Sequence, residues 1–544
     1  MQRPRVARPS NRRRGYGPRG RRWAVAGAAG LLGLLALATS AAAAPSPART
    51  ADPRAFTVYH GDAAGTGAVA AVSSVDLKAP AWTSPTLDGE IYGEPLVASG
   101  RVFVATENDT VYALSAASGA IEWKRHLATP VSAGVLPCGD ITPEVGITGT
   151  PVIDQARGEI FVVADESVNG GPSHHLIGLE LSTGDVELSQ VVDPPGADPR
   201  AILQRTGLTL DAGRVVFGFG GNYGDCSTYH GWVVAVPEAG GAADEFAVDP
   251  GPGESQGAIW MGGAAPAVDG AGNIWVEAGN GSVTSSAHAY DDSDSVLELS
   301  SSLRLRQFFA PITWPSDNAH DLDLSMEPVL LSDGEVVAAG KSRIAFLLKR
   351  SHLGGIGHQQ AELGSLCSQD IDGGAAVQST TVYLPCLSGT VAIRVDVSPP
   401  GLHLLWSSGS GGGPPLVAAG LVWTIGQNGE LYGLDPATGD VREQAAVGAP
   451  ANHFPTPSLG DGLLLAPSAD GVVAFTAVQT VTATTSTTTT TSLTPGASVA
   501  TTLAPAGRSS NGGLPATGIA AIVILGLVVG GGVARAISRR RRSS

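Results

Sequence analysis

The sequence predicts an all-β fold, a β-propeller of about eight four-stranded blades, and two observations carry this prediction. The first is a repeated hairpin signature, in which an alternating strand, a glycine-containing turn and the start of another strand follow one another. The clearest copies are residues 109–123, 175–186 and 429–441. A further strand with its own glycine turn precedes each copy, so one repeat forms a four-stranded antiparallel sheet.

The second observation is the spacing of the copies along the chain. Less regular copies begin near Arg214, Ile274, Glu335, Thr381 and Leu463. The eight copies average about 53 residues, near the size of kelch-type blades. Seven blades is the alternative, because long insertions rich in glycine and serine interrupt the middle copies.

The two ends of the repeat region complement each other. The last copy ends at Phe475 without a following strand, whereas the segment from Phe56 to Trp82 precedes the first copy and has no repeat of its own. We expect this N-terminal segment to supply the missing outer strand. The ring would then close and leave no sheet edge exposed.

The repeats resemble the pyrroloquinoline quinone (PQQ)-type propeller repeat, whose core reads Tyr-Ala-Leu-Asp-x-x-Thr-Gly-x-x-x-Trp. The copy at residues 429–441 carries this pattern in Tyr432, Leu434, Asp435 and Gly439. The resemblance extends over residues 51–476 and implies the fold. It does not imply an activity, because the same repeat occurs in non-catalytic scaffold proteins.

Two short stretches also resemble motifs of the quinoprotein dehydrogenases, which hold the quinone and a calcium ion on the propeller axis. Residues 278–281 resemble the loop that presents the metal-binding Asn, here Asn280. Residues 320–324 resemble the loop that carries the catalytic Asp, here Asp321. Together with Glu144, these side chains offer the oxygen donors that calcium prefers. The resemblance implies one hypothesis, an extracellular dehydrogenase that depends on PQQ and calcium.

The chain departs from that family at two points. Many members cover the quinone with a disulfide between adjacent cysteines, and no two cysteines are neighbours here. The Trp beneath the quinone ring has no assigned counterpart, with Trp260 and Trp314 as candidates. Asp and Asn are also ordinary turn residues in propeller loops. The leading hypothesis is therefore a non-catalytic binding or scaffold module that needs no cofactor and binds an extracellular protein or a glycan.

Four cysteines, Cys138, Cys226, Cys367 and Cys386, are an even number without Cys-x-x-Cys spacing. In an exported protein this favours disulfides over a metal site. Of the three connectivities we favour Cys138–Cys226 together with Cys367–Cys386. Free buried thiols are the alternative, since cysteine is among the most buried residue types.

Both ends of the chain carry sorting signals. Residues 1–44 combine nine arginines, an apolar stretch and a run of alanines. This is the pattern of a secretory signal peptide, and Arg21-Arg22 leaves twin-arginine export as an alternative. Near the other end, the pentapeptide Leu514, Pro515, Ala516, Thr517 and Gly518 precedes an apolar run and a basic tail.

This second signal, residues 514–544, resembles the cell-wall sorting signal of Gram-positive surface proteins. The resemblance implies that a sortase cleaves after Thr517 and joins it to peptidoglycan. The apolar run is close to the short limit of a membrane span, so the membrane would hold the precursor only until sorting. Residues 477–513, rich in Thr, Ser, Pro and Ala, would form a disordered stalk.

The charge of the mature chain limits the classes of partner that it can bind. The two sorting segments hold 14 arginines and no acidic residue, so their removal changes the formal net charge from −16 to about −30. A surface this negative repels nucleic acid and anionic lipid. We expect neither as a partner.

Overall fold

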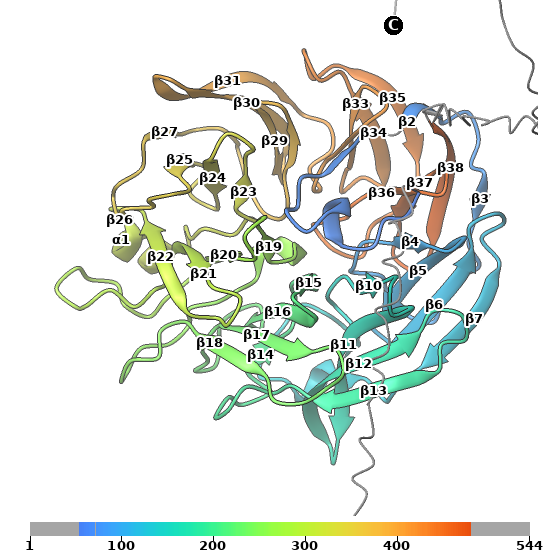
Figure 1. Cartoon of the computed structure of the whole chain (residues 1–544), viewed down its shortest axis with the longest axis horizontal. Helices are drawn as coiled ribbons and strands as arrows, with labels where there is room; N and C mark the ends of the chain where they lie inside the picture. The colour runs from blue at the N-terminus through green and yellow to red at the C-terminus, as the bar shows by residue number, and fades with distance from the viewer. Residues whose placement is uncertain (1–53, 71, 480–544) are drawn as a thin grey trace, which may run out of the picture. The chain divides into compact units, whose positions relative to one another are not determined.

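Eight β-sheets form the blades of a propeller in residues 54–70 and 72–479, which are the residues that the computed structural model describes (Figure 1). The prediction of eight blades is confirmed, and the alternative of seven is excluded. The signal peptide, the sorting signal and nearly all of the predicted stalk lie outside the described residues. Among the described residues, no helix is long and apolar enough to cross a membrane.

Blades one to four follow one another along the chain, each running from an inner to an outer strand. Blade one comprises β4 (Leu96–Ala98), β5 (Arg101–Thr106), β6 (Thr110–Ser115) and β7 (Ile121–His126), and blade two comprises β10 (Val152–Asp154), β11 (Glu159–Val168), β12 (Gly171–Glu180) and β13 (Val186–Val191). Blade three comprises β15 (Thr209–Asp211), β16 (Arg214–Gly221), β17 (Trp232–Pro237) and β18 (Asp244–Ala247), with β14 (Ile202–Leu203) beside β16. Blade four comprises β19 (Ala267–Val268), β20 (Ile274–Ala278), β21 (Ser295–Leu299) and β22 (Leu305–Ala310), with β26 (Gly355–Ile356) beside β22.

Blades five to eight complete the ring in the same order. Blade five comprises β23 (Val329–Leu330), β24 (Glu335–Ala339), β25 (Ala345–Lys349) and β27 (Ala361–Leu363), and blade six comprises β28 (Ala376–Gln378), β29 (Thr381–Cys386), β30 (Gly389–Val397) and β31 (Pro400–Ser408). Blade seven comprises β32 (Leu416–Ala418), β33 (Leu421–Ile425), β34 (Glu430–Leu434) and β35 (Val441–Ala446), with β1 (Ala68–Val69) parallel to β32. Blade eight comprises β36 (Ser458–Gly460), β37 (Leu463–Pro467) and β38 (Val472–Gln479), with β2 (Val72–Asp76) and β3 (Trp82–Thr83) beside β38.

Short elements connect the blades. They are the hairpin of β8 (Val131–Ser132) and β9 (Glu144–Val145), the 3-10 helices η1 (Tyr59–Gly61), η2 (Ala133–Val135) and η3 (Met261–Gly263), and the α-helix α1 (Trp314–His320).

Burial follows the position of a strand within its blade. The second and third strands of blade one, β5 and β6, are buried on both faces, whereas the outer strand β7 alternates between exposed and half-buried side chains. The middle strands are therefore apolar on both faces because each blade packs between two neighbours. The hydrophobic core lies between the blades, and its largest cluster joins blades one, two, seven and eight.

The N-terminal segment closes the ring. Strand β2 pairs antiparallel with β38, with Ser74 opposite Val478, and β3 continues along the same strand, with Trp82 opposite Ala474. This confirms the prediction that the segment from Phe56 to Trp82 supplies the missing outer strand of the last blade.

Residues 56–69, here called the axial segment, have a second role that the sequence did not predict. Their backbone hydrogen-bonds to the inner strands β4, β10, β19, β28 and β32, which belong to five different blades. The Tyr59 hydroxyl also accepts a hydrogen bond from the Gly374 N–H (3.1 Å), and the Glu94 carboxylate accepts one from the His60 N–H (2.8 Å). Figure 1 shows this segment near the centre of the ring. It ties the inner strands together across the axis.

At three joints, a tryptophan on an outer strand packs on the turn glycine of the next blade. The pairs are Trp82 on Gly119, Trp123 on Gly184 and Trp406 on Gly439. In each pair the indole N–H donates to the carbonyl three residues before the glycine, at 2.8 Å (Ala116), 3.1 Å (Leu181) and 2.9 Å (Pro436). The Thr-Gly and Trp positions of the repeat therefore act in neighbouring blades, and together they join those blades.

Both predicted disulfides form. Cys367–Cys386 ties the segment before β28 to the end of β29, within blade six, and Cys138–Cys226 joins the hairpin of β8 and β9 to blade three.

We predict that Gly439→Ala destabilises the propeller more than Gly420→Ala. Both glycines have φ +74°, so both changes introduce the same backbone strain, of about 1 kcal/mol. A Cβ at Gly439 would lie 2.5 Å from Trp406 Cε3, whereas a Cβ at Gly420 meets no atom within 4 Å. Overpacking should therefore cost Gly439→Ala about 1–3 kcal/mol more in the free energy of unfolding, measured by urea denaturation. Equal losses in the two variants would show that the tryptophan joint contributes nothing.

Candidate functional site

A cavity of about 870 Å³ is the candidate functional site. Its walls come from the hairpin of β8 and β9, from loops of blades three to six and from the segment that precedes β36. Loops from so many blades converge only near the propeller axis. The volume is in the range of pockets that hold small-molecule ligands.

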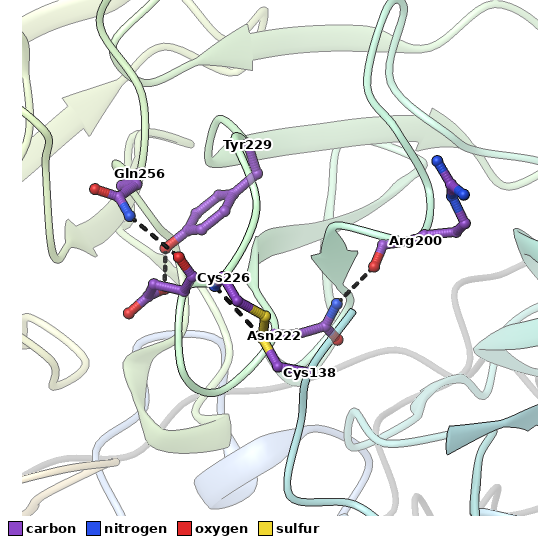
Figure 2. The surroundings of a disulfide bond; sticks show 7 residues. Cys138, Arg200, Asn222, Cys226, Tyr229 and Gln256 are labelled. Carbon is purple, nitrogen blue, oxygen red and sulfur yellow. Dashed lines mark hydrogen bonds between the residues drawn. A yellow bond between two sulfur atoms is a disulfide. The ribbon is translucent and has the colours of Figure 1, made fainter. Parts of the chain in front are cut away.

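Figure 2 shows the disulfide Cys138–Cys226, whose sequence neighbours Asp140 and Asp225 line this cavity. The disulfide fixes the loop between β16 and β17, which carries Asp225 into the cavity wall. The Tyr229 hydroxyl donates to Asp225 Oδ1 at 2.6 Å, and the amide of Gln256 donates to the Asp225 backbone oxygen at 3.4 Å. Neutral donors therefore hold Asp225 in place, Tyr229 at the carboxylate and Gln256 at the backbone.

Asn280 lies beside Asp225, in the turn between β20 and β21. Its Nδ2 donates to Asp225 Oδ2 at 3.0 Å, and its backbone is left-handed, with φ 53°. The Asn280 side chain is buried and lines the cavity. Asn280 and Asp225 thus bring a carboxylate and an amide oxygen close together.

Asp321 also lines the cavity, lies at the C-cap of α1 and is paired with Lys341. The Lys341 Nζ lies 2.5 Å from Asp321 Oδ1, 3.2 Å from Asp323 Oδ1 and 5.3 Å from the centre of the Trp260 ring. Burial alone would lower the pKa of Lys341, but the two carboxylates outweigh burial and raise it. Lys341 is therefore protonated, and Asp321 is an ion-paired carboxylate.

Two of the three predicted ligand and catalytic residues meet in this cavity, Asn280 and Asp321, and Trp260 joins them. Glu144 does not line the cavity; it lies in β9, in the hairpin with β8. The other Trp candidate, Trp314, is buried at the start of α1 and packs against Tyr290. Sequence reasoning missed Asp225, although its position next to Cys226 was a signal that a disulfide would place it.

A second group of acidic side chains is buried where blades one and two meet. Glu107, Asp109 and Asp165 are each at most 3% exposed, and neither carboxylate oxygen of Asp109 has a hydrogen-bond partner among the described residues. Burial, followed by the charges of Asp165 and Glu107, raises the pKa of Asp109 to about 10. Burial raises the pKa of Glu107 to about 8. Glu144 acts on this group, since its charge also raises the pKa of Asp109.

Comparisons with known proteins agree with this architecture. A model of PQQ-type repeats, described as "Outer membrane protein assembly factor BamB", matches residues 57–291, which is less than half of the chain. Quinohemoprotein alcohol dehydrogenase ADHIIG from Pseudomonas putida HK5 superposes with a TM-score of 0.59 at 14% identity, over 78% of this chain and 80% of that chain. The fold is a PQQ-type β-propeller.

Two further solved structures show the same likeness. Quinohemoprotein alcohol dehydrogenase from Comamonas testosteroni gives a TM-score of 0.56 at 15% identity, over 78% of this chain and 80% of that chain. A europium-containing methanol dehydrogenase gives 0.56 at 14% identity, over 78% of this chain and 98% of that chain. No curated protein sequence matches the chain. At such low identities the likeness shows the fold and leaves the activity open.

The residues around the cavity fit the quinone and calcium of those dehydrogenases only in part. The quinone is a polycarboxylate, and of the two cations that line the cavity Lys341 is already paired with Asp321 and Asp323, which leaves Arg205. Asp225 and Asn280 offer calcium two neighbouring oxygen donors, but Glu144 is not there to join them. Among the described residues, no group of three or more His, Cys, Asp or Glu side chains is arranged to hold a metal ion.

The buried acidic group predicts that stability falls as the pH rises. A carboxyl whose pKa is higher in the folded chain than its unfolded value of about 4 contributes to the free energy of unfolding, and this contribution is complete below pH 4. That contribution is lost progressively as the pH rises toward the folded values of about 8 for Glu107 and about 10 for Asp109. The melting temperature should therefore be lower at pH 9 than at pH 6.

The variant Asp109→Asn assigns this effect to the buried group. Asparagine has nearly the shape of a neutral carboxyl and does not titrate, so the variant should lose less stability between pH 6 and pH 9 than the parent chain. Asp333→Asn, which removes an exposed carboxylate in the turn between β23 and β24, is the control and should behave like the parent. An identical drop in the parent and in Asp109→Asn would contradict the prediction.

Proposed function

We propose that this protein is a non-catalytic binding module, anchored to the cell wall, whose axial cavity holds its ligand. The secretory signal and the sorting signal support the location. Sortase and peptidoglycan are then its partners in anchoring, and an extracellular protein or glycan supplies the ligand. A rigid ring with variable loops is suited to binding, because the blades fix the loops in space.

The observation that carries the non-catalytic part is the pairing of Asp321. A general base must be free to accept a proton from its substrate. Asp321 Oδ1 instead lies 2.5 Å from Lys341 Nζ, so this oxygen is already held in an ion pair. The incomplete ligand set for calcium supports the same conclusion.

The second candidate is an extracellular dehydrogenase that depends on PQQ and calcium. It is favoured by one observation, that Asn280, Asp321 and Trp260 line the same cavity. If calcium were bound, Asn280 and Asp225 would contribute oxygen ligands, and Trp260 would lie against the ring. The quinone would supply the two-electron acceptor for oxidation of an alcohol.

Reconstitution separates the two candidates. We expect that the secreted protein, incubated with PQQ and calcium and then desalted, retains no quinone absorbance and does not reduce an artificial electron acceptor in the presence of alcohols. The spectrum and the dye assay are the measurements, with an established quinoprotein as the positive control. Retained quinone with alcohol oxidation, both lost in Asn280→Ala, would overturn the proposed function in favour of the dehydrogenase.

The anchoring part is tested at Thr517. Thr517→Ala should remove the protein from the covalently bound peptidoglycan fraction and leave it in the membrane or the medium, because a sortase attacks the carbonyl of that threonine. Ala516→Ser, at the variable position of the motif, should be sorted like the parent. Equal recovery of parent and Thr517→Ala from purified peptidoglycan would exclude anchoring by a sortase.

A further inference from the structure

The charges that line the axial cavity are unbalanced. Five aspartates reach its wall, against Arg205 and Lys341: Asp140, Asp225, Asp321, Asp370 and Asp372. Lys341 is already neutralised by Asp321 and by Asp323 behind it. The remaining cation, Arg205, stacks on the Phe454 ring at 5.0 Å.

Four of the five aspartates form no ion pair with a described residue. They are Asp140, Asp225, Asp370 and Asp372, and they come from three separate parts of the chain: the hairpin of β8 and β9, blade three and the segment before β28. Asp225 is also fixed by Tyr229 and Asn280, which donate hydrogen bonds but no positive charge. Folding therefore holds negative charge at the cavity without compensating it.

Arg205 does not restore the balance. It also lines a small pocket that shares Gly262 and Phe454 with this cavity. One arginine therefore stands against four aspartates that form no ion pair with a described residue. Charges of one sign in a concave, partly desolvated site raise the local concentration of ligands of the opposite sign.

We propose that the axial cavity binds a ligand bearing protonated amines, with Asp225 and Asp370 receiving the ammonium groups. This rests on the proposed function and names its ligand class. Trp260, Phe454 and Tyr223 supply apolar surface for the carbon skeleton of such a ligand. The amine can belong to a free organic amine or to an amine-bearing envelope glycan, because the recognised chemistry is the same.

Titration calorimetry on the full secreted chain tests the proposal with three probes. Spermidine represents the free amine, a short glucosamine oligomer the amine-bearing glycan, and the N-acetylated form of that oligomer the uncharged control. We expect binding of at least one amine probe, weaker binding as salt is added, and no binding of the acetylated oligomer. Which amine probe binds more tightly decides between the two sources.

Variants tie the binding to the named carboxylates. Asp370→Asn and Asp225→Asn should each weaken amine binding about tenfold, the loss expected for one charged hydrogen bond. Asp333→Asn removes the same charge outside the cavity and should leave the affinity unchanged. Asp225→Asn also alters contacts to Tyr229 and Asn280, so the melting temperature of this variant is measured as a test of its folding. If Asp225→Asn does not fold, the affinity of Asp370→Asn decides whether the carboxylates bind the amine.

Three results would overturn the ligand class. They are failure of both amine probes to bind, equal binding of the acetylated oligomer, and unchanged affinity in Asp370→Asn. Binding of PQQ with calcium that is tighter than binding of either amine would also overturn it. Only alcohol oxidation with the quinone would overturn the non-catalytic function. A failure of the ligand class is therefore distinguishable from a failure of the proposed function.

Discussion

Closure of the ring is the constraint on which the rest of the structure depends. Each middle strand is apolar on both faces, so a blade is stable only with a neighbour on either side. The N-terminal segment joins blades one and eight. Its strands β2 and β3 complete the last blade, and its Trp82 packs on Gly119 of the first blade. A continuous chain of blades thereby becomes a closed ring, in which each outer strand, such as β7, remains a short sheet edge.

Local signals made the blades predictable from the sequence. A strand with alternating side chains, a turn glycine with positive φ and a tryptophan further along belong to one repeat, so the pattern is visible within a few dozen residues. The axial segment was not predictable in this way, because its partners on β28 and β32 lie hundreds of residues away in the sequence. Nothing local distinguishes Gly65 and Gly67 there from ordinary turn glycines.

The same difference between local features and long-range contacts applies to the residues of the candidate site. The loop that holds Asn280 and the C-cap that holds Asp321 are local features, and both residues line the cavity, while their roles as ligand and base stay predictions. Glu144 does not line this cavity, because its place is set by the pairing of β9 with β8, where Ser132 lies opposite Glu144. Asp225 gains its position from the Cys138–Cys226 disulfide, a contact across 88 residues.

The rigidity of the ring also decides what the cavity can recognise. Loops fixed by closed blades, by a disulfide and by hydrogen bonds to Asp225 have lost most of their conformational freedom during folding, so little remains to be lost when a ligand binds. The charge pattern of the cavity is fixed at the same time. Lys341 is paired before any ligand arrives, whereas Asp225 is not, and the cation that an anion could meet without displacing a carboxylate is Arg205, which stacks on Phe454. A cation meets an unpaired carboxylate directly, which is why selection by charge favours it.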